Sequence, residues 1–195
     1  MSDADVKCQI IDSATKYFSR YGFHKTTMDE IARNIHKAKG VLYYYFKSKE
    51  ELFKEVLRRE LGNIQEALLK TVQSGKNSLI ILSDYMLTRF KLLNEAVNYH
   101  ETLKADFFEK YNFVKDVRED FDRFEQDQLR AIIEKGNKEG YLHVQNVGPT
   151  VDVAIMIIKS IEIPLFLQDK YKAYENTLRD LTNMITGSLQ YPSNS

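Results

Sequence analysis

The sequence predicts an all-α protein, and three observations lead to that prediction. The 195-residue chain contains only eight glycines and three prolines, too few for the many turns of a β architecture. Apolar residues recur at helical spacing along most of the chain. The composition is 43% hydrophobic and 12% aromatic, which is enough to bury cores and argues against disorder. We therefore expect long helices joined by short connections.

The first 47 residues predict a small three-helix domain. The first helix places Ile10, Ala14 and Phe18 on one stripe and ends at Gly22. Residues 27–30, Thr-Met-Asp-Glu, fit a capping box that satisfies amides at the start of a second helix. Its apolar face ends after two turns, and a third apolar segment follows after a handful of residues. Two short helices with a tight turn between them, a helix-turn-helix, are predicted.

The remainder of the chain, residues 48–195, predicts a second helical domain. Residues 48–51, Ser-Lys-Glu-Glu, form another capping box that begins a long fourth helix. Residues 113–135 predict an acidic amphipathic helix. Helix breaks are expected near 74–75, Asn94, 110–112, 136–148 and Asp169.

The last two predicted helices carry the pattern of an interface. Residues 151–163 present far more apolar surface than one core-facing stripe requires. The final helix repeats apolar residues at three-four spacing, as a helix seam does. The two helices could pair with their symmetry mates in a four-helix dimer interface, or form a fully buried hairpin within a monomer. The dimer interpretation selects Ile155, Ile158, Tyr174, Leu178, Leu181 and Ile185.

Formal charge is zero overall but uneven along the chain. Residues 1–50 carry nine Lys/Arg against six Asp/Glu, and residues 51–195 carry 19 against 22. An excess of positive charge at the N-terminus suits nucleic acid, although a solvated face explains it about as well.

The compartment expected is the cytoplasm, with no membrane span. The most apolar run, residues 151–167, is interrupted by charges and Pro164 and is shorter than a span of roughly 20 residues. No N-terminal stretch resembles a signal peptide. The single Cys8 cannot form an internal disulfide, and we expect it to be a small buried side chain.

The third predicted helix departs from a simple core helix. Lys37 and Lys39 stand at its start, followed by Gly40 and the three tyrosines of 43–45. Glycine in a helix costs roughly 1 kcal/mol against alanine, which suggests close approach by something bulky. DNA fits, because lysines neutralise phosphates and tyrosine hydroxyls donate to them. The alternative is that the tyrosines cover the core and the lysines are solvated.

These segments resemble the tetracycline-repressor (TetR) family. The resemblance rests on Ala14, Phe18, Gly22, Thr27, Ile31-Ala32, Lys39-Gly40, Leu42-Tyr43, Phe46 and the run Lys49-Glu50-Glu51-Leu52, about a quarter of the chain. It implies that Thr27, Tyr43, Tyr44 and Lys49 contact the DNA backbone and that the first residues of the third helix face base edges. The DNA-binding candidates are Thr26, Thr27, Lys37, Ala38, Lys39, Val41, Tyr43, Tyr44 and Lys49.

Three positions in the turn depart from the family pattern. His36 stands where the family often has glycine, and histidine tolerates a positive φ better than most residues. Lys37 replaces a commonly apolar residue. Ala38 replaces a commonly hydroxylated one, so the third helix lacks a cap worth about 1 kcal/mol. The operator sequence therefore cannot be transferred from the family.

The resemblance also implies a homodimeric transcriptional repressor with two partners, a near-palindromic double-stranded DNA operator and a small-molecule effector. Effector and DNA binding would be negatively coupled in both directions. Large side chains of the middle helices suggest a mostly apolar ligand. The candidates for its pocket are Tyr85, Phe90, Tyr99, Phe107, Phe124 and Met156.

Two other classes of function are an enzyme and a helical protein-interaction module without DNA binding. Residues 100–104, His-Glu-Thr-Leu-Lys, miss a zinc-protease motif because Lys104 replaces the second histidine. Residues 13–16, Ser-Ala-Thr-Lys, match a serine-acylase motif that lacks its partner motifs. The four histidines share no ligand spacing and no phosphate loop is evident, so we expect no catalytic residue, metal or cofactor. The lysines and tyrosines of the third helix argue against the interaction module.

Overall fold

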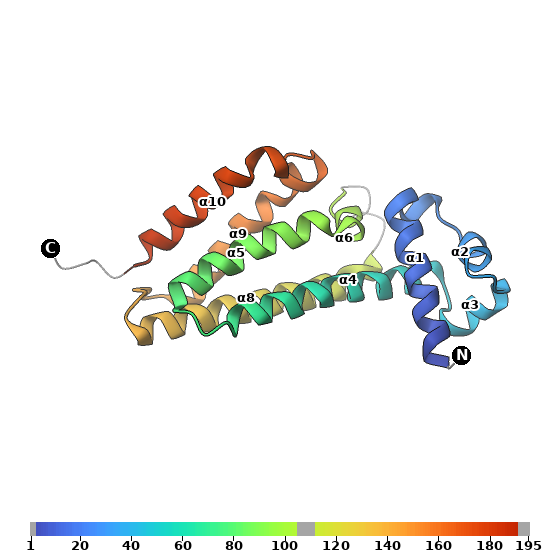
Figure 1. The fold of residues 1–195 in the computed structure, drawn as a ribbon, viewed down its shortest axis with the longest axis horizontal. Helices are drawn as coiled ribbons and strands as arrows, with labels where there is room; N and C mark the ends of the chain where they lie inside the picture. The colour runs from blue at the N-terminus through green and yellow to red at the C-terminus, as the bar shows by residue number, and fades with distance from the viewer. Residues whose placement is uncertain (1–2, 105–111, 191–195) are drawn as a thin grey trace. The chain divides into compact units, whose positions relative to one another are not determined.

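The computed structural model describes residues 3–104 and 112–190, which are mostly helical (Figure 1). The predicted all-α fold is confirmed. Extended pairing within these residues is limited to an isolated bridge between Leu142 and Gln190. The elements are α1 (Asp3–Lys25), α2 (Met28–Asn34), α3 (Lys39–Tyr45), α4 (Lys49–Val72), α5 (Ser78–Glu95), α6 (Val97–Glu101), η1 (Asn112–Val114), α8 (Lys115–Glu139), α9 (Val147–Ser160), the π-helical turn η2 (Ile163–Leu167) and α10 (Tyr171–Ser188).

One compact unit comprises the described residues of 1–62 and 96–118. In it α1 packs against α2 and α6, and α2 packs against α3 (Figure 1). Phe18, Phe23 and Phe53 form its aromatic centre, with ring centroids 5.1 to 5.9 Å apart. All three rings are buried, and large aromatic side chains of this kind dominate the energetics of a small core.

The regular part of α1 ends at Gly22, as predicted. Gly22 has a φ of +80°, a conformation that glycine adopts without a Cβ penalty. A Cβ there would also lie 3.4 Å from a carboxylate oxygen of Glu101. The buried Thr26 hydroxyl donates to the carbonyl oxygens of Gly22 (2.9 Å) and Tyr17 (3.2 Å). These contacts fix the bend that leads into α2.

Glu60 of α4 holds the start of α6. Its carboxylate accepts the backbone N–H of Tyr99 (2.7 Å) and the side-chain amide of Asn98 (3.1 Å). The same Asn98 amide donates to Ser19 of α1 (2.9 Å). Burial raises the pKa of Glu60. Because Ala96, the N-cap of α6, makes no side-chain cap, the Glu60 carboxylate supplies acceptors that the local sequence lacks.

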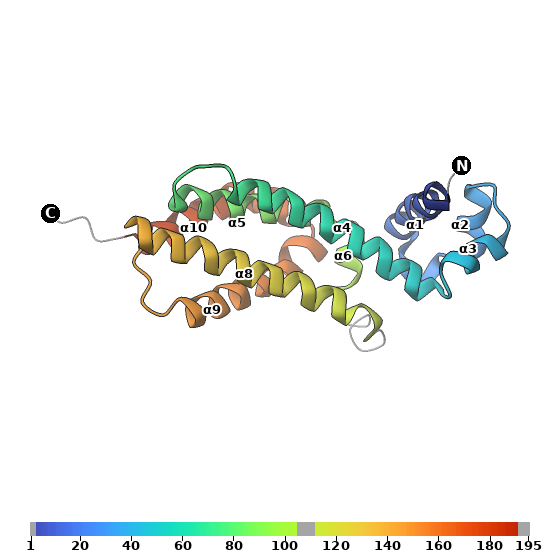
Figure 2. The same ribbon diagram turned by 90° about the horizontal axis from the view of Figure 1, so that it is seen from below.

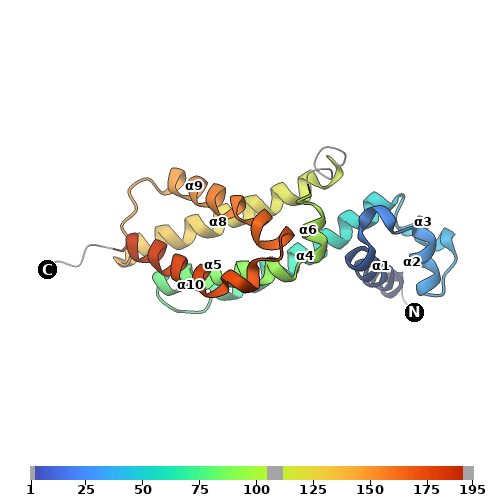
Figure 3. The ribbon, with the colours of Figure 1, turned by 90° about the horizontal axis from the view of Figure 1, so that it is seen from above.

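The described residues of 63–95 and 119–190 form a second compact unit. Its helices α5, α8, α9 and α10 run alongside one another (Figures 2 and 3), with α10 packed on α5. The acidic amphipathic helix predicted at 113–135 is present as α8. It continues past Gly136, where a Cβ would come 2.4 Å from the Leu142 side chain. The break expected at Asp169 is confirmed by a φ of +51°.

A buried ion cluster joins three elements of this unit. Arg89 of α5 donates from Nη2 to Glu125 of α8 (3.0 Å) and to Glu162 (2.5 Å), which precedes η2. Its Nε donates to the other oxygen of Glu125. All three side chains are buried, and burial raises the pKa of Glu125. Removing Arg89 would leave two buried carboxylates without its compensating charge, so the cluster fixes how these helices pack.

Helices α9 and α10 each bury one apolar face and expose another. On α9 Val151, Ile155 and Ile158 are buried, whereas Val153, Met156 and Ile157 are exposed. The predicted excess of apolar surface on this segment is therefore confirmed in the single chain. On α10 the buried positions are Tyr171, Leu178, Thr182 and Thr186, and the exposed apolar ones are Tyr174, Leu181, Met184 and Ile185.

Two further expectations concern the membrane and the cysteine. Within the described part of the chain, no helix combines the length and apolar composition needed to cross a bilayer. The expectation that Cys8 is buried was wrong, because its position on α1 faces outward. The apolar stripe of that helix starts two residues later, at Ile10, which is fully buried.

Candidate nucleic-acid interface and apolar cavity

The helix α2 begins with the predicted capping box. The Thr27 hydroxyl accepts the backbone N–H of Glu30 (3.3 Å), and the Glu30 carboxylate accepts the backbone N–H of Thr27 (2.9 Å). The Thr27 hydroxyl also donates to that carboxylate, and these hydrogen bonds lower the pKa of Glu30. Met28 and Ile31 are buried beneath. The start of α2 is thus fixed by its own sequence.

The turn between α2 and α3 has the predicted conformation. His36 has a φ of +52°, and the next backbone N–H, of Lys37, donates to the carbonyl oxygen of Ala32 (3.0 Å). Ala38 is the N-cap of α3 and makes no side-chain hydrogen bond, so the predicted loss of a cap is confirmed. This turn sets the direction in which α3 leaves α2.

The outer face of α3 is exposed. Of its seven residues, all of which the structure describes, only Leu42 is buried. Lys39, Gly40, Tyr43 and Tyr44 are exposed, and Tyr44 is 78% exposed. The interpretation that the tyrosines merely cover the core therefore fails for two of the three. The third, Tyr45, is half-buried and donates its hydroxyl to the carboxylate of Asp3 at the start of α1.

Lys39 lies on this outer face and forms an ion pair with Asp29. Its ammonium is 3.0 Å from a carboxylate oxygen of Asp29 and 5.8 Å from the centre of the Tyr43 ring. Asp29 raises the pKa of Lys39, first through a hydrogen bond and then through its charge. The lysine therefore stays charged at neutral pH. A phosphate would compete with Asp29 for the ammonium group.

Nothing in the geometry of the protein itself requires glycine at position 40. A Cβ built on Gly40 would meet no atom of the described residues within 4 Å. Its φ is not in the positive region that favours glycine. The helix therefore accepts a destabilising residue without an internal reason, and the free space lies on its exposed side.

Two DNA-binding candidates have their polar groups hydrogen-bonded within the chain. Thr26 is 1% exposed and its hydroxyl is used inside the bend after α1, so its side chain has no access to the surface. The Lys49 ammonium donates to the carbonyl oxygen of Phe23 (2.8 Å), and burial lowers its pKa. Thr27 and Ala38 are exposed, whereas Lys37 and Val41 are half-buried.

The six candidates for the effector pocket are not brought together. Tyr85 is fully buried, which raises the pKa of its hydroxyl, and Tyr99 is buried in the other compact unit. Phe90 lines a polar cleft between α5 and α10. Phe124 is half-buried and Met156 is 68% exposed. Phe107 lies outside the described residues.

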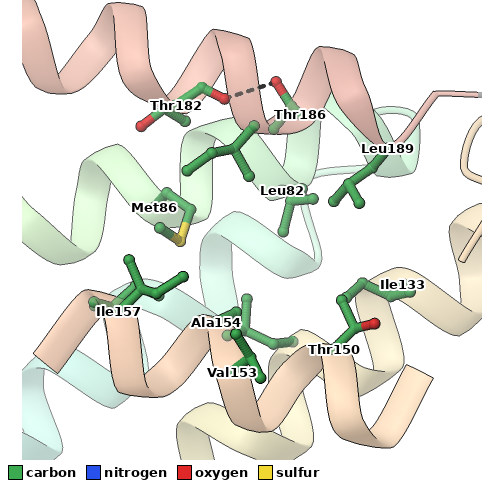
Figure 4. A pocket seen from close by; sticks show the side chains of 13 residues that line it. Leu82, Met86, Ile133, Thr150, Val153, Ala154, Ile157, Thr182, Thr186 and Leu189 are labelled. Carbon is green, nitrogen blue, oxygen red and sulfur yellow. Dashed lines mark hydrogen bonds between the residues drawn. The ribbon is translucent and has the colours of Figure 1, made fainter. Parts of the chain in front are cut away.

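A cavity of about 220 Å³ lies instead among α5, α8, α9 and α10, all within the second unit (Figure 4). The aromatic candidates do not line it. Reasoning from the sequence missed it because aliphatic side chains at ordinary core spacing carry no sign of a void. Its lining residues are Leu82, Met86, Leu129, Ile133, Thr150, Val153, Ala154, Ile157, Ile158, Thr182, Ile185, Thr186 and Leu189.

Comparison with known proteins points to a family of regulators. The family model for bacterial regulatory proteins of the tetR family matches residues 10–56. The regulator YhgD of Bacillus subtilis is 30% identical over 140 residues, 70% of this chain and 71% of YhgD. QacR of Staphylococcus aureus is 26% identical over 160 residues, 80% of this chain and 84% of QacR. The negative regulator IcaR of Staphylococcus epidermidis is 28% identical over 75% of this chain and 65% of IcaR.

Solved structures share the fold. A transcriptional regulator from Cytophaga hutchinsonii superposes with a TM-score of 0.79 and 23% identity, covering 97% of this chain and all of that one. SmeT, in complex with triclosan, superposes with a TM-score of 0.75 and 15% identity, covering 96% of this chain and 92% of SmeT.

The family model matches the region that contains the capped α2, the His36 turn and the exposed α3. The match to YhgD extends well beyond that region, over most of both chains. The chain therefore belongs to the TetR family of bacterial regulatory proteins and is a DNA-binding transcriptional regulator.

Proposed function

We propose that this protein is a homodimeric repressor that acts in the bacterial cytoplasm, binds a near-palindromic operator and is released from it by a small, mostly apolar effector. The observation that carries the proposal is the outer face of α3, where Lys39, Gly40, Tyr43 and Tyr44 are exposed around one buried leucine. IcaR is named a negative regulator and SmeT holds triclosan, which supports repression and an apolar effector.

The residues on α3 suit a phosphate backbone. The Lys39 ammonium supplies charge, and the hydroxyls of Tyr43 and Tyr44 are donors on exposed side chains. Gly40 leaves room for a DNA strand beside the helix. Specificity would come from the start of α3 and its N-cap, Ala38, whose short side chain provides apolar contact but no hydrogen bond to a base.

Dimerisation would use the exposed apolar residues of the last two helices. Of the six interface candidates, Tyr174, Leu181 and Ile185 are exposed, whereas Ile155, Ile158 and Leu178 are buried within the chain. Apolar surface gathered in this way marks an interaction site. We define the α9–α10 apolar face as Val153, Met156, Ile157, Tyr174, Leu181, Met184 and Ile185.

A twofold dimer explains the operator that we propose. It would present two copies of α3 to successive major grooves, roughly 34 Å apart, so that the operator is nearly palindromic. An effector that favours another conformation would lower DNA affinity, and DNA would lower effector affinity by the same factor.

The test is selection of bound fragments from the source genome by the purified protein, followed by affinity measurements against salt. We expect one near-palindromic sequence, with an affinity that falls steeply as salt rises because each neutralised phosphate releases counterions. Recovery of no fragment above background, from a folded dimer at low salt, would overturn the proposal.

A further inference from the structure

The cavity in the second unit has an apolar wall. Of its thirteen lining residues, ten are aliphatic or methionine and three are threonines, so among the described residues no charged or aromatic side chain lines it. Its volume of about 220 Å³ exceeds the roughly 150 Å³ of an engineered apolar cavity that stays dry and binds benzene.

The threonines add little polarity to the wall. The Thr182 hydroxyl donates to the carbonyl oxygen of Leu178 (2.7 Å), and the Thr186 hydroxyl donates to that of Thr182 (2.9 Å), as Figure 4 shows for the second bond. Both hydroxyl protons are therefore used within α10. Thr150 lies at the opposite wall. A ligand here meets a wall that is almost entirely hydrocarbon.

The cavity opens on the α9–α10 apolar face. Val153, Ile157 and Ile185 line the cavity and are 53%, 52% and 39% exposed. These three side chains therefore border both the cavity and the surface that the proposed function assigns to a second copy of the chain. A second copy seated on this face would cover the mouth.

We propose that this cavity binds a small uncharged hydrocarbon, of the size of an alkylbenzene, and that a second copy of the chain completes the site. The proposal rests on the dimer of the proposed function and names the ligand class and the part that the second copy plays in the site. A ligand enclosed by two copies makes more contacts in the dimer than in the monomer. It therefore binds the dimer more tightly and strengthens dimerisation by the same factor.

The probes are ethylbenzene and the 2-phenylethylammonium ion, which share a carbon skeleton and differ in charge. Binding of each to the full chain is measured by isothermal titration calorimetry at neutral pH. We expect ethylbenzene to bind and the ammonium ion to bind at least about 100-fold more weakly, because the wall has no group to pair with a charge. Equal affinity for the two probes, or no binding of ethylbenzene, would overturn the proposal.

Two matched substitutions locate the probe. Ala154 lines the cavity, so Ala154→Phe fills it and is expected to weaken ethylbenzene binding by about tenfold or more. Ala131→Phe makes the same change at an exposed position of α8 that does not line the cavity, and should bind like the wild type. Circular dichroism checks that both variants are folded. Unchanged binding by a folded Ala154→Phe would place the probe elsewhere and reject the site.

The link to dimerisation is measured separately, by sedimentation velocity over a range of protein concentrations with and without saturating ethylbenzene. We expect the probe to lower the dimer dissociation constant about fivefold or more. No change, or a rise, would contradict completion of the site, and a rise would indicate that side chains of the second copy fill the cavity. DNA binding without probe tests the proposed function by itself, so either proposal can fail while the other stands.

Discussion

Two exposed surfaces in the described part of this chain, on α3 and on the α9–α10 apolar face, present large side chains of opposite character. On α3 they are a lysine and two tyrosines around a glycine, each carrying a polar group that can donate a hydrogen bond. On the α9–α10 apolar face they are methionines and branched aliphatics, with one tyrosine. Both surfaces exceed what packing of a single chain needs. The α3 surface suits an anionic polymer, because its side chains can donate hydrogen bonds to phosphates. The α9–α10 apolar face suits another apolar surface.

The most direct test of this comparison places a charge on the α9–α10 apolar face. Leu181 is 41% exposed, so Leu181→Glu should leave the single chain folded. In a twofold dimer each copy would bury an unpaired carboxylate, and we expect the dimer dissociation constant to rise about 1,000-fold. Sedimentation velocity measures this rise.

Asn176→Glu is the matched control, because it adds the same charge at an exposed position of α10 outside the apolar face. It should dimerise like the wild type. If Leu181→Glu also remains a dimer, the α9–α10 apolar face is not the interface.

The second test reverses the charge on α3. Lys39→Glu should weaken operator binding about 30-fold or more and make the dependence on salt shallower, because one phosphate contact is lost. Dimerisation should not change. Lys172→Glu, an exposed lysine of α10, is the control and should bind DNA as the wild type does. Equal losses from both substitutions would mean that net charge, not α3, governs binding.

Much of the fold was predictable because its signals are local. The Thr27 capping box, the bend at Gly22, the left-handed His36 and the uncapped Ala38 each depend on a few neighbouring residues. The surplus of apolar residues on α9 is also visible without knowledge of packing, because it exceeds the one stripe that a helix buries against a core.

The parts that could not be predicted depend on contacts between distant segments. Lys49 is a residue type usually found at the surface, yet its ammonium donates to the carbonyl oxygen of Phe23, 26 residues earlier. The Thr26 hydroxyl bonds locally to Gly22, but its burial depends on the packing of the whole unit. Arg89 is buried only because Glu125 and Glu162 reach it from other elements. The cavity depends on how four helix faces meet, and large aromatic side chains were a poor guide to it because such side chains fill space.

A smaller effect is expected at the start of α2. Thr27→Ala removes the side-chain cap and should cost about 1 kcal/mol of unfolding free energy, measured by chemical denaturation. Thr177→Ala, at an exposed position of α10, should change stability much less. If the two variants are equally stable, the capping box does not contribute as the geometry indicates.

The contribution of this cap should depend on pH. The hydrogen bonds of Thr27 lower the pKa of Glu30 from its ordinary value of 4.5 in the folded state. Because the pKa of Glu30 is lower in the folded state than in the unfolded state, its ionised carboxylate stabilises the fold at pH values above the unfolded-state pKa. This stabilisation is lost as pH falls through the folded-state pKa. The difference between wild type and Thr27→Ala should therefore shrink below pH 4.5. A difference that grows on acidification would contradict this assignment.

The smallest change in stability is the most informative about α3. Gly40→Ala should stabilise the fold by about 0.5 kcal/mol, because alanine favours the helix and the added Cβ meets no atom of the described chain within 4 Å. Gly62→Ala on α4, where the space is equally open, should give a similar gain.

The two variants should differ in operator affinity, measured by fluorescence anisotropy. Gly40→Ala should bind more weakly than wild type and Gly62→Ala equally well, because only the first places a methyl group where a DNA strand approaches. Full affinity in Gly40→Ala would mean that DNA does not come close to this helix, and the polar character of the α3 surface would then need another partner.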